Sequence, residues 1–220
     1  MLGLSNNRRI FMGTLFSIDE IIASPCKAAI LRVMASRQGL KATGRQIAVL
    51  GGFSAPSTHE ALKYLHARNV LLLEVIGKQH IYSLNEEDRL VQKVIRPMFK
   101  AVSGLKEEIG SFIVKEMKRE GIQKSVIAVF LYGSVQKGVA VLGSDVDIAV
   151  IVAKASDVEC VSEVFVSTIA SRFKSYFGAQ LDPYIKSSNE FRGMLKKNLP
   201  PVSTLIKSYS VLYGKEPLEA

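Results

Sequence analysis

The stretch "LYGSVQKGVAVLGSDVDIAVIV", residues 131–152, decides how the second half of the chain folds. It places a Gly-Ser pair ahead of an Asp-x-Asp, and apolar runs typical of β-strands contain both. Burying an unpaired carboxylate is costly, and two neighbouring carboxylates also repel each other. A strand that carries both Asp145 and Asp147 therefore predicts a positively charged partner for them.

The alternation of a strand places these two carboxylates on one side. Asp145 and Asp147 point the same way, about 7 Å apart by strand rise, while the valine between them points the other way. Two converging carboxylates form a hard-oxygen site suited to Mg²⁺. Two-metal chemistry needs a third carboxylate, and we expect Asp182, from an adjacent strand around 179–185, to supply it. Asp182 would ligate the second metal or accept the proton of an attacking hydroxyl.

The Gly-Ser pair supplies the other half of the predicted site. An apolar strand, 125–132, ends at Tyr132, and Gly133 and Ser134 then open a predicted helical turn. Small residues there let backbone N–H groups approach phosphate oxygens, while the start of a helix adds partial positive charge. We therefore expect a nucleoside triphosphate and its metals to lie between this turn and the Asp pair.

The first third of the chain has a different pattern. We predict three helices and then a hairpin that turns at Gly77-Lys78, in the segments 25–38, 43–52, 54–70 and 71–84. Ser24-Pro25 is typical of a helix start, and the glycine pair after "TGRQIAVL" of a helix end. This order is typical of a winged helix-turn-helix.

The charge of this region favours nucleic acid as its partner. The chain carries a net charge of +9, and residues 1–85, with ten basic and four acidic residues, carry +6 of it. We expect the helix 54–70 to enter the major groove, while residues of the preceding helix and of the wing reach phosphates. A winged helix that binds protein instead is the alternative. The predicted DNA-contacting residues are Ser54, Ser57, Thr58, His59 and Lys63 on the helix, with Arg45, Lys78 and His80 around it.

Residues 86–122 connect the two regions and are predicted to be a long helix. Apolar residues recur in it at spacings of four and three, and Pro97 is expected to kink it. We favour a connecting helix whose stripe packs on its own domains. The alternative is a homodimer formed through residues 86–120. The stripe consists of Val91, Ile95, Met98, Val102, Leu105, Ile109 and Phe112.

Composition narrows the class of protein. The chain has 220 residues, of which 48% are apolar and 22% charged, as in a globular protein. It contains no apolar stretch of about 20 residues and no ordered secretory signal, so we expect a cytoplasmic protein with no membrane partner. Cys26 and Cys160 have no metal-ligand spacing, and we expect both to be reduced core residues.

The remaining segments complete an α+β fold. After the strand at 144–152 we expect an amphipathic helix over 157–177 and the strand that carries Asp182. Two helical pieces divided by Pro200-Pro201 are predicted over 191–214. The expected division of the chain is a winged-helix domain at 1–85, a connecting helix at 86–122 and a catalytic domain at 123–220.

The motif in 131–152 resembles the signature of the DNA polymerase β-type nucleotidyltransferase superfamily, in its minimal branch. The resemblance covers about 124–216 and includes Gly138, Ser144 and "LYGKEP". It implies a small mixed sheet with helices, and Mg²⁺-dependent transfer of a nucleoside monophosphate with release of pyrophosphate. By position, Gly133 and Ser134 would contact the triphosphate, as would Ser144, while Asp145, Asp147 and Asp182 would hold metal. Residues 17–85 resemble winged-helix transcription regulators.

Two functions follow as hypotheses. The first is a nucleotidyltransferase that moves a nucleoside monophosphate from ATP or another triphosphate onto a hydroxyl, coupled to a DNA-binding winged helix. Its acceptor is left open between a protein, an RNA end and a small molecule. The second is a transcription regulator whose C-terminal domain senses nucleotide without turning it over.

Overall fold

The computed structural model describes residues 18–139, 141 and 143–219. The chain divides into two compact units, Met1–Ser103 and Gly104–Ala220, which we describe separately. The division falls inside the segment that the sequence predicts to be one connecting helix. No helix in the described part is both long enough and apolar enough to cross a membrane.

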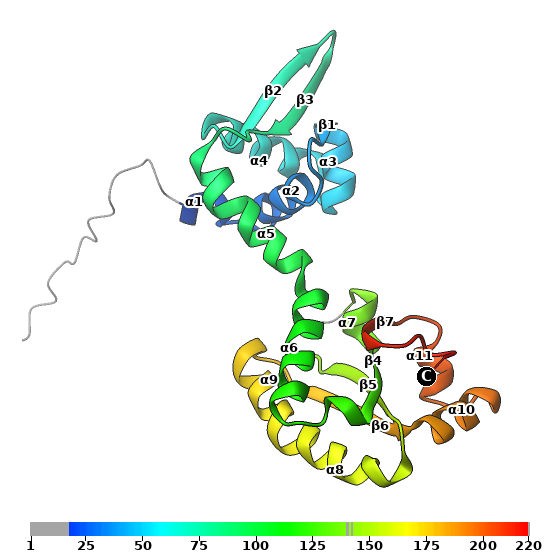
Figure 1. Cartoon of the computed structure of the whole chain (residues 1–220). Helices are drawn as coiled ribbons and strands as arrows, with labels where there is room; N and C mark the ends of the chain where they lie inside the picture. Colours follow the sequence, from blue (N-terminus) through cyan, green and yellow to red (C-terminus); the bar gives the residue numbers. More distant parts are fainter. Residues whose placement is uncertain (1–17, 140, 142, 220) are drawn as a thin grey trace, which may run out of the picture. The chain divides into compact units, whose positions relative to one another are not determined.

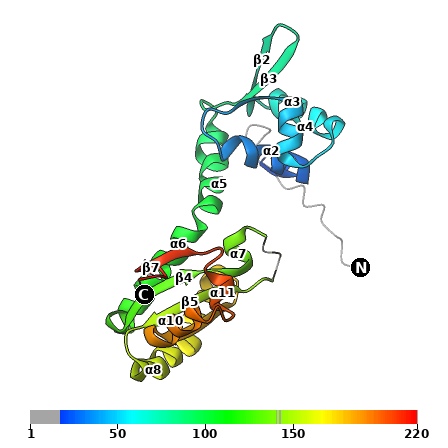
Figure 2. The same cartoon turned by 90° about the vertical axis from the view of Figure 1, so that its right-hand side faces the viewer.

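The N-terminal unit consists of helices and a β-hairpin (Figures 1 and 2). Its elements in chain order are α1 (Ile18–Ile22), α2 (Pro25–Ala35), β1 (Lys41–Thr43), α3 (Gly44–Gly51), α4 (Ala55–Ala67), β2 (Leu71–Ile76), β3 (Gln79–Leu84), the π-helical turn η1 (Val91–Ile95) and α5 (Arg96–Ser103).

Local capping explains where these helices begin. The Ser24 hydroxyl accepts a hydrogen bond from the N–H of Lys27, and Pro25 occupies the first helical position. Thr43 and Gln46 form a reciprocal capping box at the start of α3, which Gly52 ends in a left-handed conformation. Such signals are local, so the sequence alone locates these helix ends.

The hairpin belongs to a three-stranded sheet. The strand order is β1-β3-β2, and both pairs are antiparallel. β1 lies between α2 and α3 and was not predicted, because three residues give no periodicity to recognise. Three helices, this short strand and the projecting hairpin together form a winged helix-turn-helix arrangement.

The predicted connecting helix is broken. η1 and α5 belong to the N-terminal unit, and a turn at Gly104 separates them from α6 (Leu105–Arg119). The wide π-helical turn ends two residues before Pro97, whose ring and missing N–H disturb a regular helix there. The apolar stripe divides accordingly. Val91 and Ile95 pack in the N-terminal core, Ile109 in the C-terminal core.

The C-terminal unit is built on a mixed four-stranded sheet of order β6-β5-β4-β7, in which only β5 and β6 are parallel. Its elements after α6 are η2 (Gln123–Ser125), β4 (Val126–Leu131), α7 (Gly133–Lys137), β5 (Val146–Val152), η3 (Ala155–Asp157), α8 (Val158–Glu163), the π-helical η4 (Val164–Ile169), α9 (Ala170–Phe177), β6 (Leu181–Ser187), α10 (Ser188–Lys196), α11 (Val202–Leu205) and β7 (Ser210–Gly214).

Two apolar layers cover the two faces of this sheet (Figure 1). Val146, Ile148 and their alternate neighbours on β5 pack with residues of α6, α8, η4 and α9. Ala149 and Ile151, on the opposite face, pack with residues of α10 and α11. This alternation decides which face the aspartates of β5 and β6 occupy.

Two expectations for this unit are wrong. Residues 210–214 form the edge strand β7 rather than the end of a helical piece, because their pairing with β4 satisfies the sheet edge. The pattern "SVLYG" is too short to be distinguished from a helical segment by periodicity. Cys160 is exposed on α8, whereas Cys26 is buried as expected.

Candidate functional site

The Gly-Ser turn lies directly against Asp147. Gly133 has a φ of +76°, and a Cβ atom added to it would lie 1.8 Å from Oδ2 of Asp147. Only glycine tolerates both this conformation and this contact. The backbone N–H of Ser134 lowers the pKa of the Asp147 carboxyl, which places this N–H on the side of the carboxylate. The structure therefore brings together the two halves of the motif, which α7 and the following loop separate in the sequence.

Asp147 also has a neighbour on each side in the sheet. The N–H of Tyr132, directly after β4, donates to the carbonyl oxygen of Asp147 at 3.1 Å. On the other side, Asp147 is the register partner of Asp182 in the parallel strand β6. By alternation with Ala149 and Tyr184, which pack on the α10–α11 side, both carboxylates lie on that face of the sheet.

The three predicted carboxylates differ in exposure. Asp147 is half-buried within β5, whereas Asp145 precedes the strand and is exposed. Asp182 is exposed on β6, which is an edge strand. The edge position explains why Pro183 can follow it, since a proline N would break a ladder hydrogen bond in a central strand.

The charges of this group raise the affinity of Asp147 for a proton. Burial raises the pKa of the Asp147 carboxyl, and the negative charges of Asp182 and Asp145 raise it further, while the N–H of Ser134 opposes them. Burial, with the charges of Asp147 and Asp182, raises the pKa of Tyr132 to about 12. The phenol beside the carboxylates therefore stays protonated at neutral pH.

The donor set suits a divalent cation. No cluster of three His, Cys, Asp or Glu side chains in the described ranges is close enough to hold a metal ion without further ligands. Asp147 and Asp182 nonetheless share one face at matching register, and carboxylate oxygens are the donors that Mg²⁺ prefers. Mg²⁺ commonly completes its coordination with phosphate oxygens and water, so two or three carboxylates fit it.

Ser144 stabilises the turn that leads into β5. Its hydroxyl accepts a hydrogen bond from the N–H of Val141, and its own N–H donates to the carbonyl of Val141, both at 3.0 Å. A contact between Ser144 and nucleotide stays a prediction. Ala140 and Leu142 of the same loop lie outside the described residues.

With this geometry, the comparison of sequence families is informative. Residues 112–196 match the family described as "Nucleotidyltransferase domain". This segment is a nucleotidyltransferase domain. The match includes the Gly-Ser turn and all three aspartates, and it begins inside α6, ahead of the boundary expected at 123. The search of curated proteins finds no match.

Similar solved structures were also found, all at a TM-score of 0.33. A predicted DNA-binding transcriptional regulator from E. coli is 11% identical and covers 40% of this chain and 84% of its own. A toxin-antitoxin crystallised with AMP-PNP is 22% identical, with 49% and 74% covered. The AntR antimony-specific transcriptional repressor is 16% identical, with 50% and 99% covered.

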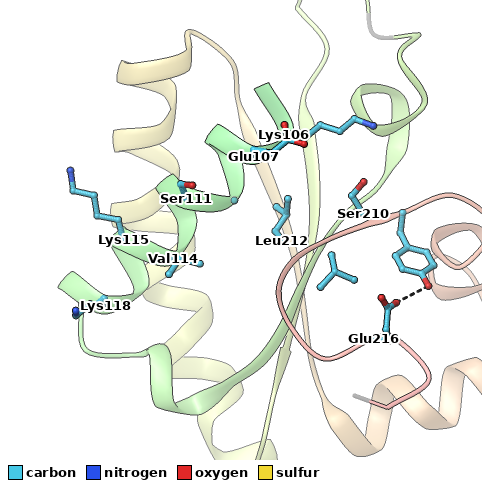
Figure 3. Close-up of a pocket in the computed structure, with 12 residues that line it drawn as sticks. Lys106, Glu107, Ser111, Val114, Lys115, Lys118, Ser210, Leu212 and Glu216 are labelled. Atoms are coloured by element: carbon cyan, nitrogen blue, oxygen red, sulfur yellow. Dashed lines mark hydrogen bonds between the residues drawn. The ribbon is translucent and has the colours of Figure 1, made fainter. Parts of the chain in front are cut away.

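The C-terminal unit has a groove that none of the predicted site residues lines. It has a volume of about 1020 Å³ and lies between α6 and β7 (Figure 3). At its rim, the Tyr209 hydroxyl donates to Glu216 at 2.9 Å. Lys106 and Ser210 hydrogen-bond to Gln136 of α7 and so fix the helix that carries the Gly-Ser turn.

In the N-terminal unit, most predicted DNA-contacting side chains are exposed. His59 and Lys63 lie on the outer side of α4, Arg45 on α3, and Lys78 and His80 on the hairpin. Among the described residues, neither Arg45 nor the two lysines has a hydrogen-bond or ion-pair partner. These cations are therefore available to an external anion.

The N-terminal residues of α4 have structural roles as well. Ser54 caps the helix by accepting the N–H of Ser57, and the two hydroxyls hydrogen-bond to each other at 2.9 Å. The prediction for Thr58 is wrong. Its exposed fraction is 1%, because it faces the core together with Ala61 and Leu62 one turn further along the helix.

Proposed function

We propose that the chain is a Mg²⁺-dependent nucleotidyltransferase that transfers a nucleoside monophosphate from a triphosphate to a hydroxyl acceptor. The observation that carries the proposal is the pairing of Asp147 with Asp182 on one face, against the backbone of Gly133. Such a site suits in-line attack on a phosphate, where positioning and charge neutralisation provide most of the rate enhancement.

Each residue has a proposed role. Asp145, Asp147 and Asp182 would hold the divalent ions, which supply neutralising charge for the phosphates when bound. The backbone of Gly133 and Ser134 would contact the triphosphate, with Ser144 nearby in the loop that precedes β5. The exposed Asp182 would also accept the proton of the acceptor hydroxyl. The acceptor and the preferred base stay open.

The test is nucleotide turnover by the full chain. Labelled triphosphates and Mg²⁺ should give pyrophosphate release or label on an added acceptor. Asp182→Asn should abolish it, while Asp157→Asn, a matched change in η3 outside the site, should not. Turnover that survives Asp182→Asn would refute the assigned role of that carboxylate. Tight nucleotide binding with no turnover would instead favour a nucleotide-sensing regulator.

We further propose that the N-terminal unit binds DNA through α4, with the hairpin and α3 contacting phosphates. The support is the surplus of positive charge together with the exposed, unpartnered Arg45, Lys63 and Lys78. Lys63→Ala should weaken duplex binding and reduce the slope of affinity against salt by about one ion. Absence of duplex binding at low salt would refute the proposal.

A further inference from the structure

A groove in the N-terminal unit combines positive charge with exposed aliphatic surface. It lies among α3, β1 and β3 and has a volume of about 810 Å³ (Figure 1 locates these elements). Among the described residues, no Asp or Glu lines it. The side chains that matter here are Arg37, Lys41, Arg45, Val49, Leu50 and Ile81.

The two arginines of this groove are free to bind an external anion. Lys41 is engaged by Glu74 at 2.9 Å, so its charge is already balanced. Arg37 and Arg45 are exposed, and their guanidinium groups have no hydrogen-bond or ion-pair partner in the described part of the chain. Guanidinium groups bind carboxylates through paired, charge-assisted hydrogen bonds, so two such groups favour an occupant with acidic side chains.

The apolar side of the groove comes from α3. Ile47 and Ala48 of this helix are buried, but Val49 is 78% exposed and Leu50 43% exposed. Helix α3 therefore presents aliphatic side chains on a face that its own unit does not cover. Neighbouring exposed aliphatic residues beside a polar rim are typical of a surface that binds another molecule.

We propose that this groove binds an acidic, aliphatic peptide segment of a partner protein. Carboxylates of the segment would pair with Arg37 and, where no DNA phosphate occupies it, with Arg45, while its aliphatic side chains would cover Val49 and Leu50. A DNA backbone offers anions for the arginines but no comparable apolar surface for the two aliphatic residues. The proposal does not depend on nucleotidyl transfer.

The experiment selects short random peptides displayed on phage against the full-length chain. Enriched sequences are then synthesised with a fluorescent label, and their affinity is measured by anisotropy. We expect them to combine Asp or Glu with Leu, Ile or Val. Affinity should fall about tenfold for Val49→Ser and for Arg37→Gln, as expected of central interface residues.

Matched variants separate this site from unspecific effects. Val102→Ser changes another exposed valine of the same unit, and Arg32→Gln another exposed arginine, and neither residue lines the groove. Both should bind the peptides as the unchanged chain does. Circular dichroism checks that all variants are folded.

Three results would overturn the proposal. They are a selection without enrichment, enriched peptides that lack acidic residues, and peptides that bind Val49→Ser as tightly as the unchanged chain. Duplex DNA provides the competing outcome. If Val49→Ser weakens DNA binding as much as peptide binding, the groove belongs to the DNA-contacting surface and not to a protein partner.

Discussion

The C-terminal unit contains two acidic clusters whose differences are instructive. In one, Arg172 lies between Glu116 and Glu120, with an N–O distance of 2.6 Å to each. In the other, Asp147 is surrounded by Asp145 and Asp182, and no basic side chain contributes to its pKa shift. In the first cluster, the positive charge of Arg172 balances the glutamates. In the second, no basic side chain of the described residues balances the aspartates.

Glu116 therefore belongs to a cluster that stabilises the fold, whereas the charge of Asp147 is available to a bound cation. Glu116 is buried and would be costly without Arg172. Asp147 is instead held in a state that its neighbours disfavour, which is the usual electrostatic condition of a functional carboxylate. Four predictions test this distinction.

The largest effect is expected for Asp147→Asn. Nucleotide turnover should fall about 100- to 1000-fold, since a central charged ligand is lost. The melting temperature without Mg²⁺ should stay equal or rise, because a repelled, partly buried charge is removed. Turnover assays and thermal denaturation measure the two effects. A strong loss of stability would show that Asp147 is structural, as Glu116 is.

Gly133→Ala should also impair the site strongly. Its Cβ atom would occupy the position of the Asp147 carboxylate, which must then move. Gly138→Ala is the matched control, because Gly138 has a similar positive φ of +71° but no atom of the described residues within 4 Å of the added Cβ. Both variants bear a backbone cost of about 1–2 kcal/mol. Only Gly133→Ala should lose nucleotide turnover, and equal losses would contradict the assigned contact.

Arg172→Met should have the opposite profile to Asp147→Asn. It leaves the buried Glu116 with only the 4.0 Å contact to the exposed Arg119, so the melting temperature should fall by several degrees. Turnover per folded molecule should be unchanged, since the cluster lies on the α6–α9 side of the sheet. The double variant Glu116→Gln/Arg172→Met should recover part of the stability. If Arg172→Met lost turnover but not stability, the Glu116–Arg172 cluster would have a role in the reaction, and the proposed distinction between the two clusters would be wrong.

The smallest effect is expected for the dependence of the melting temperature on pH and on Mg²⁺. Because the folded-state pKa of Asp147 lies above its usual value of 3.8, the folded protein binds a proton more tightly than the unfolded chain. This contribution makes stability fall as pH rises from 3.8 through the raised pKa. We therefore expect the unchanged chain in EDTA to melt at a lower temperature than Asp147→Asn. This difference should grow as pH rises from 3.8 through the raised pKa.

Addition of Mg²⁺ at neutral pH should then remove the deficit of the unchanged chain, because a cation bound to the carboxylates stabilises the folded state by mass action. Asp147→Asn should respond less. Identical responses of the two proteins to Mg²⁺ would mean that the ion does not bind at this cluster.

Much of the site could be predicted because its signals are local. Alternation along the apolar run indicates the face that Asp147 occupies, although β5 begins only after Asp145, and a small residue pair after β4 indicates a tight turn. Capping residues such as Ser24 and Thr43 likewise mark helix ends. These features depend on residues only a few positions apart, so one sequence is enough to find them.

Other features depend on pairing between distant segments. Whether β7 forms depends on the free edge of β4, about 80 residues earlier, and a five-residue pattern does not reveal it. Thr58 was assigned to the exposed face of α4 because polar residues usually are exposed, yet the rotation of the helix buries it. Likewise, the sequence does not show that Arg37 and Arg45 line one groove beside α3, because this depends on how distant segments pack.

The sequence by itself determined that two aspartates interrupt an apolar strand behind a Gly-Ser turn, because backbone periodicity acts over a few residues. Only the tertiary structure decided that Asp182 pairs with Asp147 and that Gly133 touches its carboxylate. Strand order and register arise from burial of both faces of the sheet at once. That is a property of the whole packed unit rather than of any one segment.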